Sequence, residues 1–434
     1  MLFRSKKEHK DDMDFVFKGR LNKYRDLDYI ACWFFKGSNY IRNSNIKLAF
    51  VSTNSICQGD SVGLFWPNIF SLDIDIFFTH TSFKWQNNAK SNAGVVVVIV
   101  GLKDKKNKAK KLIFTNQNQF DVDNISPYLT KGGNLVVSRR KKVISNNLPK
   151  MNFGNMPNDG GGLILSTLQK EEILDQNPEC SKIIRKFVGS QEFIRGQDRW
   201  CLWINDEDLP LAMSSSLIKD RINSIQKQRE SSSRIGTVKA ANTPHKFSEI
   251  RHKEGNSIII PRVSSERRDY LPIGFLDENS IISDSAQAIY EAEPWLFGLL
   301  ASKMHMVWLK AVGGRLKTDI RYSAEICYNT FPFPNISEKQ KQIIQKQVYN
   351  ILSEREKHPE KTMAQLYDPD KMPDGLRQAH HFNDLAIESC YRQRPFTSDE
   401  ERLEYLFKLY EKMTDEENLN LLNSTPLKQN SKTN

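Results

Sequence analysis

Two basic segments of the sequence carry side chains that suit contacts with a nucleic acid. Residues 258–275 (IIIPRVSSERRDYLPIGF) run from an apolar stretch into arginines and serines, and residues 313–323 (GGRLKTDIRYS) follow an apolar stretch. Guanidinium groups bind phosphate or guanine through paired hydrogen bonds, and hydroxyl groups donate to phosphate oxygens. The candidate contact residues are Arg262, Ser264, Ser265, Arg267 and Arg268 in the first segment and Arg315, Lys317, Arg321 and Tyr322 in the second.

Each segment also has a simpler interpretation as an exposed, solvated loop. In the first segment, Glu266 and Asp269 would then pair with the arginines as surface salt bridges. The same two interpretations apply to residues 313–323. From the residues alone, a nucleic-acid binder is the favoured class.

Other residue types that do chemistry do not form a known motif in this sequence. The adjacent pair His380-His381 would point about 100° apart on a helix, which suits a single metal ion poorly. The acidic runs at 171–172 and 206–208 are most simply solvated, and the sequence has no Gly-x-Ser-x-Gly nucleophile motif. The six cysteines lie at least 21 positions apart, which predicts reduced thiols. We therefore expect no metal site.

The charge of the chain is basic and unevenly distributed. The 434 residues carry a net charge of +11, and residues 1–150 hold 25 Lys and Arg against 12 Asp and Glu. This balance allows a polyanionic partner. The longest apolar run, residues 94–102, is too short for a membrane helix, and the N-terminal residues lack the apolar core of a signal peptide. We expect a cytoplasmic protein that does not contact membranes.

Residues 1–150 alternate predicted helices and strands. Residues 111–115 are expected to return as a hairpin after a Lys-rich turn, and Pro67 is expected to end or bend its helix. The order is typical of the second half of an open α/β sheet, although no strand is followed by a glycine-rich nucleotide turn. Periodicity predicts helices over 27–41 and 62–70 and strands over 47–53, 73–78, 95–100 and 111–115.

The rest of the chain is predicted as two further domains and a tail. A cluster of Gly, Pro and Asn at 154–162 indicates a boundary, after which residues 151–335 have the mixed pattern of an α+β domain. Residues 336–413 are predicted to be helical, and residues 414–434 are polar, which predicts a disordered tail. Expected strands here are 200–204 and 257–260. Expected helices are 214–229, 293–312, 337–356 (after a capping box of Ser337 and Gln340), 375–390 and 398–413.

Several segments of the sequence resemble, in the same order, one known family. They are LDYIACWFFKGSNYI, AFVSTNSICQGDSVGLFWP, FKWQNNAKSNAGVVVVIVG, FGNMPNDGGGLIL, RWCLWI, IPRVSSERRDYLPIGF and GRLKTDIRYS. Over about residues 1–413 the chain resembles the bacterial DNA adenine-N6 methyltransferases of the Mme-like type IIL group. In that group one polypeptide carries the nuclease, methyltransferase and target-recognition segments of a restriction-modification system. The resemblance implies the C-terminal half of a Rossmann-like methyltransferase sheet in 1–150, a DNA target-recognition domain in 151–335 and a helical C-terminal domain in 336–413.

The resemblance does not include the catalytic part of the family. The family's S-adenosylmethionine glycine motif and its Asn-Pro-Pro-aromatic motif precede the segment that starts here, and the only Asn-Pro, Asn177-Pro178, is followed by Glu179. That tetrapeptide holds the adenine amino group, so we do not expect methyl transfer by this chain alone. The resemblance implies S-adenosylmethionine as the cofactor of the intact enzyme, with none bound by this chain. It also implies an interrupted gene or a partner chain that carries the N-terminal S-adenosylmethionine-binding and nuclease segments.

The resemblance suggests roles for several residues. Phe83 falls where related amino-methyltransferases place an aromatic ring against the flipped base, and Trp85 is the alternative, unless either ring packs in the sheet core. The two basic segments fall in the recognition part, so their residues become candidates for contacts with double-stranded DNA on one common surface. Glu266 becomes a candidate acceptor from a cytosine amino group.

Three functions stay open for this sequence. The leading hypothesis is the DNA-recognition portion of a site-specific adenine methyltransferase that is inactive alone or completed by a second chain. The alternative is a non-enzymatic DNA- or RNA-binding protein, such as a specificity subunit that serves another enzyme. The third is a decayed remnant without activity. A neighbouring reading frame with the glycine and Asn-Pro-Pro-aromatic motifs would favour the first.

Overall fold

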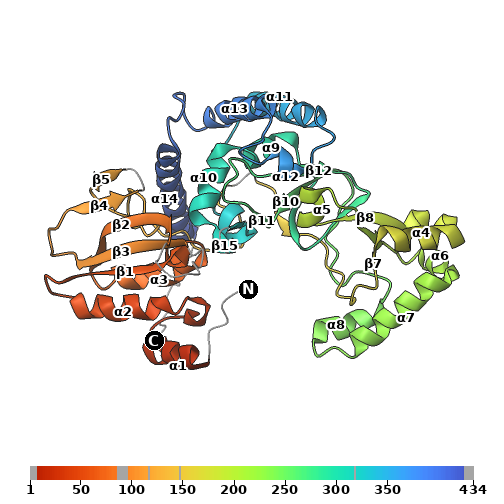
Figure 1. Ribbon diagram of the computed structural model, residues 1–434, viewed down its shortest axis with the longest axis horizontal. Coiled ribbons are helices and arrows are strands. Elements are labelled where there is room, and N and C mark those ends of the chain that lie inside the picture. The colour runs from red at the N-terminus through yellow and green to blue at the C-terminus, as the bar shows by residue number, and fades with distance from the viewer. Residues whose placement is uncertain (1–6, 86–95, 116–117, 146–147, 317–318, 425–434) are drawn as a thin grey trace, which may run out of the picture. The chain divides into compact units, whose positions relative to one another are not determined.

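The chain forms two compact units, each built from segments that are far apart in the sequence. The computed structural model describes residues 7–85, 96–115, 118–145, 148–316 and 319–424 (Figure 1). Unit 1 comprises Met1–Leu148, Val307–Asn335 and Tyr391–Asn434, and unit 2 comprises Pro149–Met306 and Ile336–Cys390. The C-terminal helices are therefore divided between the two units.

Unit 1 contains a five-stranded sheet with the order β1-β3-β2-β4-β5. Only β2 and β4 are parallel, and the other neighbours are antiparallel. The central strand β3 is a run of valines and isoleucine and is largely buried, as expected for a strand covered on both faces. The strands are β1 Lys47–Thr53, β2 Ile74–Lys84, β3 Val96–Asp104, β4 Lys111–Phe114 and β5 Gln119–Val122.

The strand positions predicted in residues 1–150 are confirmed, but the predicted hairpin is wrong. Strand β3 lies between β1 and β2, so both of its edges are already hydrogen-bonded. Strand β4 pairs instead with β2 and β5. Pairing between strands is set by contacts that are distant in sequence, and adjacency along the chain gave the wrong neighbour.

The helices of unit 1 pack aromatic side chains against this sheet. The buried rings of Phe34, Phe65 and Trp66 meet edge to face, and the indole of Trp66 donates to the carbonyl of Ile56 at 2.8 Å. Pro67 does not end its helix. The helix continues for one more turn after Pro67, to Phe70. The elements are α1 Lys7–Phe17, η1 Tyr24–Asp26, α2 Ile30–Ile41, η2 Asn54–Cys57, α3 Asp60–Phe70, β15 Gly314–Leu316, β16 Asp319–Arg321, η5 Ala324–Tyr328 and α14 Asp399–Ser424.

Helix α14 is longer than predicted and completes the core of unit 1. It continues to Ser424, so the predicted disordered tail begins within a helix, while residues 425–434 lie outside the described residues. The ring of Phe407 stacks on Tyr128 at 5.2 Å and meets Trp308 at 5.5 Å. Beyond Tyr410, the last buried residue among the described side chains of α14, Glu417 forms an ion pair with Arg140 at 2.5 Å.

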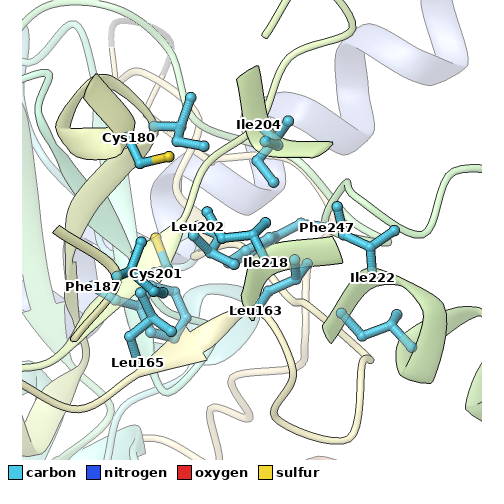
Figure 2. Packing of buried hydrophobic residues seen from close by; sticks show 14 of the residues in the cluster. Leu163, Leu165, Cys180, Phe187, Cys201, Leu202, Ile204, Ile218, Ile222 and Phe247 are labelled. Carbon is cyan, nitrogen blue, oxygen red and sulfur yellow. The ribbon is translucent and has the colours of Figure 1, made fainter. Parts of the chain in front are cut away.

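Unit 2 contains two four-stranded sheets, β12-β10-β14-β6 and β13-β8-β9-β7. Figure 2 shows the main core of the second sheet, where Leu163, Leu165 and Cys201 pack against Ile218 and Ile222. The two isoleucines lie four residues apart on one helix face, so both point into the core. The strands are β6 Asn152–Phe153, β7 Ile164–Leu165, β8 Ile184–Val188, β9 Trp200–Leu202, β10 Ser257–Pro261, β11 Val263–Ser264, β12 Gly274–Leu276, β13 Ser280–Ile282 and β14 Ala286–Tyr290.

The helices predicted in unit 2 are present, with one of them broken in two. The predicted helix 293–312 is two helices, because Ser302 accepts a hydrogen bond from the amide of His305 and begins a new helix. The capping box of Ser337 and Gln340 is confirmed. The helices are α4 Thr167–Gln176, η3 Pro178–Ile183, α5 Ser190–Arg195, α6 Leu209–Ser214, α7 Ser216–Glu230, α8 Ile235–Lys239, η4 Ala240–Asn242, α9 Pro294–Leu300, α11 Glu338–Glu356, α12 Met363–Leu366 and α13 Asp374–Glu388, with α10 Lys303–Val312 crossing the boundary between the units. The shorter helices α4, α5, α6, α8 and α12 were not predicted.

A buried arginine fixes two loops of unit 2. Arg229, near the end of α7, is fully buried and donates only to main-chain carbonyls in the contacts resolved for it. Its guanidinium reaches Pro157 at 2.7 Å and Asn158 at 3.1 Å in one loop. In the other loop it reaches three carbonyls, those of Ala240 at 3.0 Å, Thr243 at 3.1 Å and Lys246 at 2.9 Å. The positive charge is stabilised by carbonyl dipoles, which also hold the loops together.

Candidate nucleic-acid interface

The first basic segment continues from β10 of unit 2 into residues 262–270, named the 262–270 loop, which includes the two-residue strand β11. At its start, the guanidinium of Arg262 donates to the carbonyl of Asp284 at 3.1 Å and lies over the ring of Phe153 at 4.8 Å. The backbone amide of Arg262 donates to the hydroxyl of Ser190 at 3.1 Å. These contacts fix the point where the 262–270 loop leaves the sheet, so Arg262 serves as an anchor of the loop.

The middle of the 262–270 loop is a tight turn with accessible polar side chains. The amide of Arg268 donates to the carbonyl of Ser265 at 3.2 Å, and the guanidinium of Arg268 donates to the hydroxyl of buried Ser264 at 3.1 Å. The side chains of Ser265, Glu266 and Arg268 are half-buried. A turn closed in this way presents a carboxylate and a guanidinium in a fixed arrangement.

Arg267 is the most exposed arginine of this turn and already has an acidic partner. It forms an ion pair with Asp370, and both side chains are more than 60% exposed to solvent. Exposed pairs of this kind contribute little to stability because water screens them, so a phosphate can replace the carboxylate at small cost. The salt-bridged interpretation thus applies to Arg267, with a partner that the sequence did not indicate.

The second basic segment is a hairpin of unit 1. Strands β15 and β16 pair antiparallel, and Arg315 donates to the carbonyl of Lys310 at 3.1 Å. Arg321 is exposed, whereas Tyr322 is buried to 98%, and burial raises the pKa of its hydroxyl. Tyr322 is not accessible to DNA in this structure, and Lys317 lies outside the described residues. The two basic segments belong to different units, so their common surface stays a prediction.

Phe83 lies near the end of β2 within a group of aromatic rings. Its ring centroid is 6.3 Å from that of His80 and 6.5 Å from that of Trp85, and His80 stacks on Phe114 at 4.7 Å. The register of β2 against β3 shifts between His80 and Phe83, which re-aims the side chains there. Phe83 is half-buried and Trp85 is 40% exposed. The stacking role of either ring stays a prediction.

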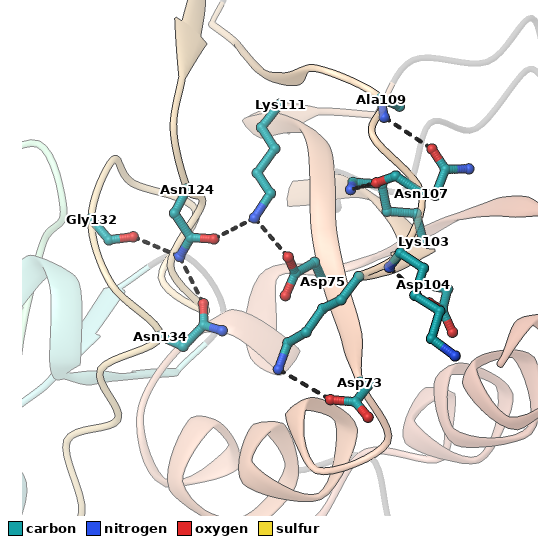
Figure 3. A network of polar contacts seen from close by, with 12 residues as sticks. Asp73, Asp75, Lys103, Asp104, Asn107, Ala109, Lys111, Asn124, Gly132 and Asn134 are labelled. Carbon is teal, nitrogen blue, oxygen red and sulfur yellow. Dashed lines mark hydrogen bonds and ion pairs between the residues drawn. The ribbon is translucent and has the colours of Figure 1, made fainter. Parts of the chain in front are cut away.

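The lysine run of residues 103–111 is largely occupied by contacts inside unit 1. Figure 3 shows Lys111 between Asp75 at 2.7 Å and the side-chain oxygen of Asn124 at 2.6 Å. Lys103 is buried and donates to the carbonyl of Asn107, and burial lowers its pKa. Asp104 accepts amide hydrogen bonds from Lys106 and Asn43, which lower its pKa. Lys103 and Lys111 thus organise the turn after β3, whereas Lys105, Lys106, Lys108 and Lys110 are exposed.

A third group of cations in unit 2 was missed by sequence reasoning. Lys182, Arg185 and Lys186 line a hollow of about 440 Å³ together with Trp200. The ammonium of Lys170 lies 3.6 Å from the centroid of the Trp200 ring. The signal in the sequence was KIIRK at 182–186, which places Lys182 just before β8 and Arg185 and Lys186 within it. Ser181, Ile184, Asp277, Asn279 and Ser280 complete the lining.

The turn from β1 to α3 in unit 1 is not a glycine-rich turn of the kind that binds nucleotide cofactors. In unit 1 the turn from β1 to α3 carries one glycine, Gly59, with a φ of +57°. The backbone of Gly314 lies 3.0 Å from the position that a side chain at Gly59 would take, so Gly59 packs closely against another segment of unit 1. In the described part of the chain there is also no group of three or more His, Cys, Asp or Glu residues placed to hold a metal ion. None of the described helices is both long and apolar enough to cross a membrane.

Three consecutive segments of the chain match family models of one enzyme. Residues 3–115 match the DNA-methyltransferase domain of MmeI, residues 131–335 its target recognition domain and residues 336–417 its C-terminal domain. These matches confirm the resemblance on which the sequence-based expectations rest.

Similar proteins show the same relationship. DNA methyltransferase A of Bacillus subtilis (strain 168) is 47% identical over 412 residues, which are 95% of this chain and 46% of that protein. The structure of the type IIL restriction-modification enzyme MmeI in complex with DNA matches with a TM-score of 0.84 and 39% identity, over 95% of this chain and 55% of that chain. The chain thus spans about half the length of these relatives. It belongs to the MmeI family and contains, in order, the end of the methyltransferase domain, the target recognition domain and the C-terminal domain.

Proposed function

We propose that this chain recognises a specific sequence in double-stranded DNA as part of adenine-N6 methylation in a restriction-modification system. The observation that carries the proposal is the accessible turn of residues 265–268, which lies within the segment that matches the target recognition domain. The solved MmeI structure contains DNA, which supports the same function.

The turn has the chemistry that base recognition requires. A carboxylate such as that of Glu266 accepts from the amino group of cytosine, and a guanidinium such as that of Arg268 donates to both acceptors of guanine. The hydroxyl of Ser265 suits either base edge or phosphate. We assign phosphate contacts to Arg267, Arg315, Lys317 and Arg321, whose charges would fix the position of the chain on the duplex without reading its sequence.

In our proposal, methyl transfer also requires catalytic and cofactor-binding residues that are not among these 434. The 434 residues contain no Asn-Pro-Pro-aromatic tetrapeptide, and the turn from β1 to α3 carries a single glycine, Gly59. S-adenosylmethionine supplies the methyl group when it is bound by another part of the enzyme, in the same polypeptide or in a separate chain. The sheet of unit 1 then serves as the end of a Rossmann-like methyltransferase sheet, and Phe83 or Trp85 would stack on the flipped adenine. Such an enzyme acts on DNA in the cytoplasm.

Selection from a pool of random duplexes tests this function. The 434-residue chain is incubated with 30-bp duplexes that carry a randomised centre, and the bound fraction is amplified and sequenced. We expect one sequence to be enriched, and binding to weaken as salt rises from 50 to 200 mM because counterions are released. Binding without any enriched sequence would contradict target recognition.

A further inference from the structure

The far end of the 262–270 loop is held by side chains of the C-terminal helices within unit 2. The buried hydroxyl of Tyr270 donates to a side-chain oxygen of Asp384 at 2.7 Å. The ring of Tyr270 stacks on that of His380, with 4.2 Å between the centroids and 22° between the planes. The other carboxylate oxygen of Asp384 accepts from the amide of Lys303 at 2.7 Å. The hydrogen bond thus fixes the hydroxyl end of Tyr270, and the stacking on His380 fixes the plane of its ring.

A second layer of buried contacts supports this anchor. The hydroxyl of Tyr367 lies 2.7 Å from Nε2 of His380, and Arg355 donates to the same hydroxyl at 2.9 Å. The guanidinium of Arg355 also donates to the carbonyl of Ile273 at 2.8 Å, just after the loop. The chain of contacts therefore begins and ends on the segment that carries the turn. Helices α11 and α13, which supply Arg355 and His380, lie side by side (Figure 1).

Helix α13 presents a row of contacts to the loop. Arg377, His380 and Asp384 are spaced by three and four residues, so they share one helix face. Arg377 pairs with Asp269 at 3.3 Å, next to the buried anchor. This ion pair is partly exposed and contributes little, whereas Tyr270, His380 and Asp384 are each at least 96% buried. The contacts among Tyr270, His380 and Asp384 therefore hold the loop to α13.

We infer that Tyr270, His380 and Asp384 are positioning residues for sequence recognition, through which the C-terminal helices hold the turn of residues 265–268 in its reading geometry. The inference rests on the proposed function. Arg262 anchors one end of the 262–270 loop and Tyr270 the other, so the turn of residues 265–268 is held from both sides. A turn that is ordered before binding loses less conformational entropy on binding and discriminates better between bases.

Hydrogen exchange of the unbound chain tests the anchoring without DNA. Tyr270→Phe keeps the ring stacked on His380 and removes only the hydroxyl, and Asp384→Asn changes the acceptor. We expect the amides of Arg267 and Arg268, which donate within the turn, to exchange about tenfold faster in both variants. Tyr391→Phe is the matched control, because its buried hydroxyl donates to Pro332 at 3.0 Å in unit 1. Unchanged exchange in the turn, or equal acceleration in the control, would overturn the inference.

Selection from the random duplex pool tests the effect on recognition. Glu266→Ala and Arg268→Ala first identify the base positions that the turn reads. In Tyr270→Phe, the preference for the enriched base should fall about threefold or more at those positions and stay unchanged at the others. In Tyr391→Phe, the base preference should stay unchanged at every position. Loss spread evenly over all positions, or no loss, would mean that the contacts serve stability alone. A wild-type chain that enriches no sequence would instead contradict the proposed function and, with it, this inference.

Discussion

The hydroxyl of Tyr270 donates a 2.7 Å hydrogen bond to Asp384, a carboxyl group 114 residues further along the chain that is itself buried. Burial raises the pKa of Asp384 to about 7, against an ordinary value of 3.8, although the hydrogen bonds from Lys303 and Tyr270 oppose this shift. Glu388 is a further acidic neighbour that raises it. The anchor of the 262–270 loop therefore contains a group that titrates near neutral pH.

Asp384→Asn should reduce the pH dependence of stability. Because the folded pKa is raised, Asp384 contributes stability fully below pH 4, and this contribution is lost as the pH rises to about 7. Between pH 5 and 8 the free energy of unfolding should fall by about 2–3 kcal/mol more in the wild type than in Asp384→Asn. Urea unfolding at each pH measures the difference. Asp121→Asn, an exposed aspartate of β5, serves as the control and should keep the wild-type slope.

Arg229→Lys should destabilise unit 2 although it keeps the charge. An ammonium has three donors, so at least two of the five carbonyls bound by Arg229 would lose their partner. We expect a loss of about 2–4 kcal/mol in the free energy of unfolding, because buried carbonyls and a buried charge are left undersatisfied. Proteolytic cleavage should appear first in the loops 157–162 and 240–249. Arg234 is an exposed arginine nearby, so Arg234→Lys should not change the free energy of unfolding measurably. A similar loss of stability in both variants would show that Arg229 does not hold the two loops together.

Arg321→Ala should weaken binding to all duplexes alike. If this exposed arginine of β16 contacts a phosphate, its removal lowers the slope of log affinity against log salt by about one and leaves the enriched sequence unchanged. Titrations of a random 30-bp duplex between 50 and 200 mM salt measure the slope. Arg394→Ala, another exposed arginine of unit 1, is the control. An unchanged slope in Arg321→Ala would remove this residue from the interface.

Glu266→Ala and Arg268→Ala should lower affinity for the enriched sequence only. A base contact of this type is worth about 1–3 kcal/mol on the preferred site and little on a random duplex. Competition between the enriched duplex and a random duplex measures the ratio of the two affinities for each variant. Equal, small losses on both duplexes would identify the two side chains as solvated surface charges.

Local signals predicted the elements well, because they depend on residues that are close in sequence. Strand β1 matches the predicted range 47–53, and the cap at Ser337 follows from its spacing to Gln340. The insertion of β3 between β1 and β2 could not be predicted in this way, because strand pairing depends on distant residues.

The candidate site was less predictable for a related reason. Charged residues are usually exposed, so Arg262 was assigned to DNA although it is engaged at the loop's base. Burial of a charge depends on partners that only the fold brings together. The anchors of the turn come from residues 355–384, which no pattern in 258–275 indicates.

The stacking of Phe407 on Tyr128 also sets an order of events during synthesis of the chain. Strands β1 to β5 of unit 1 leave the ribosome early, but the ring that covers Tyr128 and Trp308 belongs to α14 and arrives almost 300 residues later than β4. At roughly 5–20 residues per second, the apolar surface around Tyr128 stays uncovered for tens of seconds. A nascent chain stalled before α14 would therefore expose the rings of Tyr128 and Trp308, which Phe407 covers in the finished protein, so the part of unit 1 translated first is completed last.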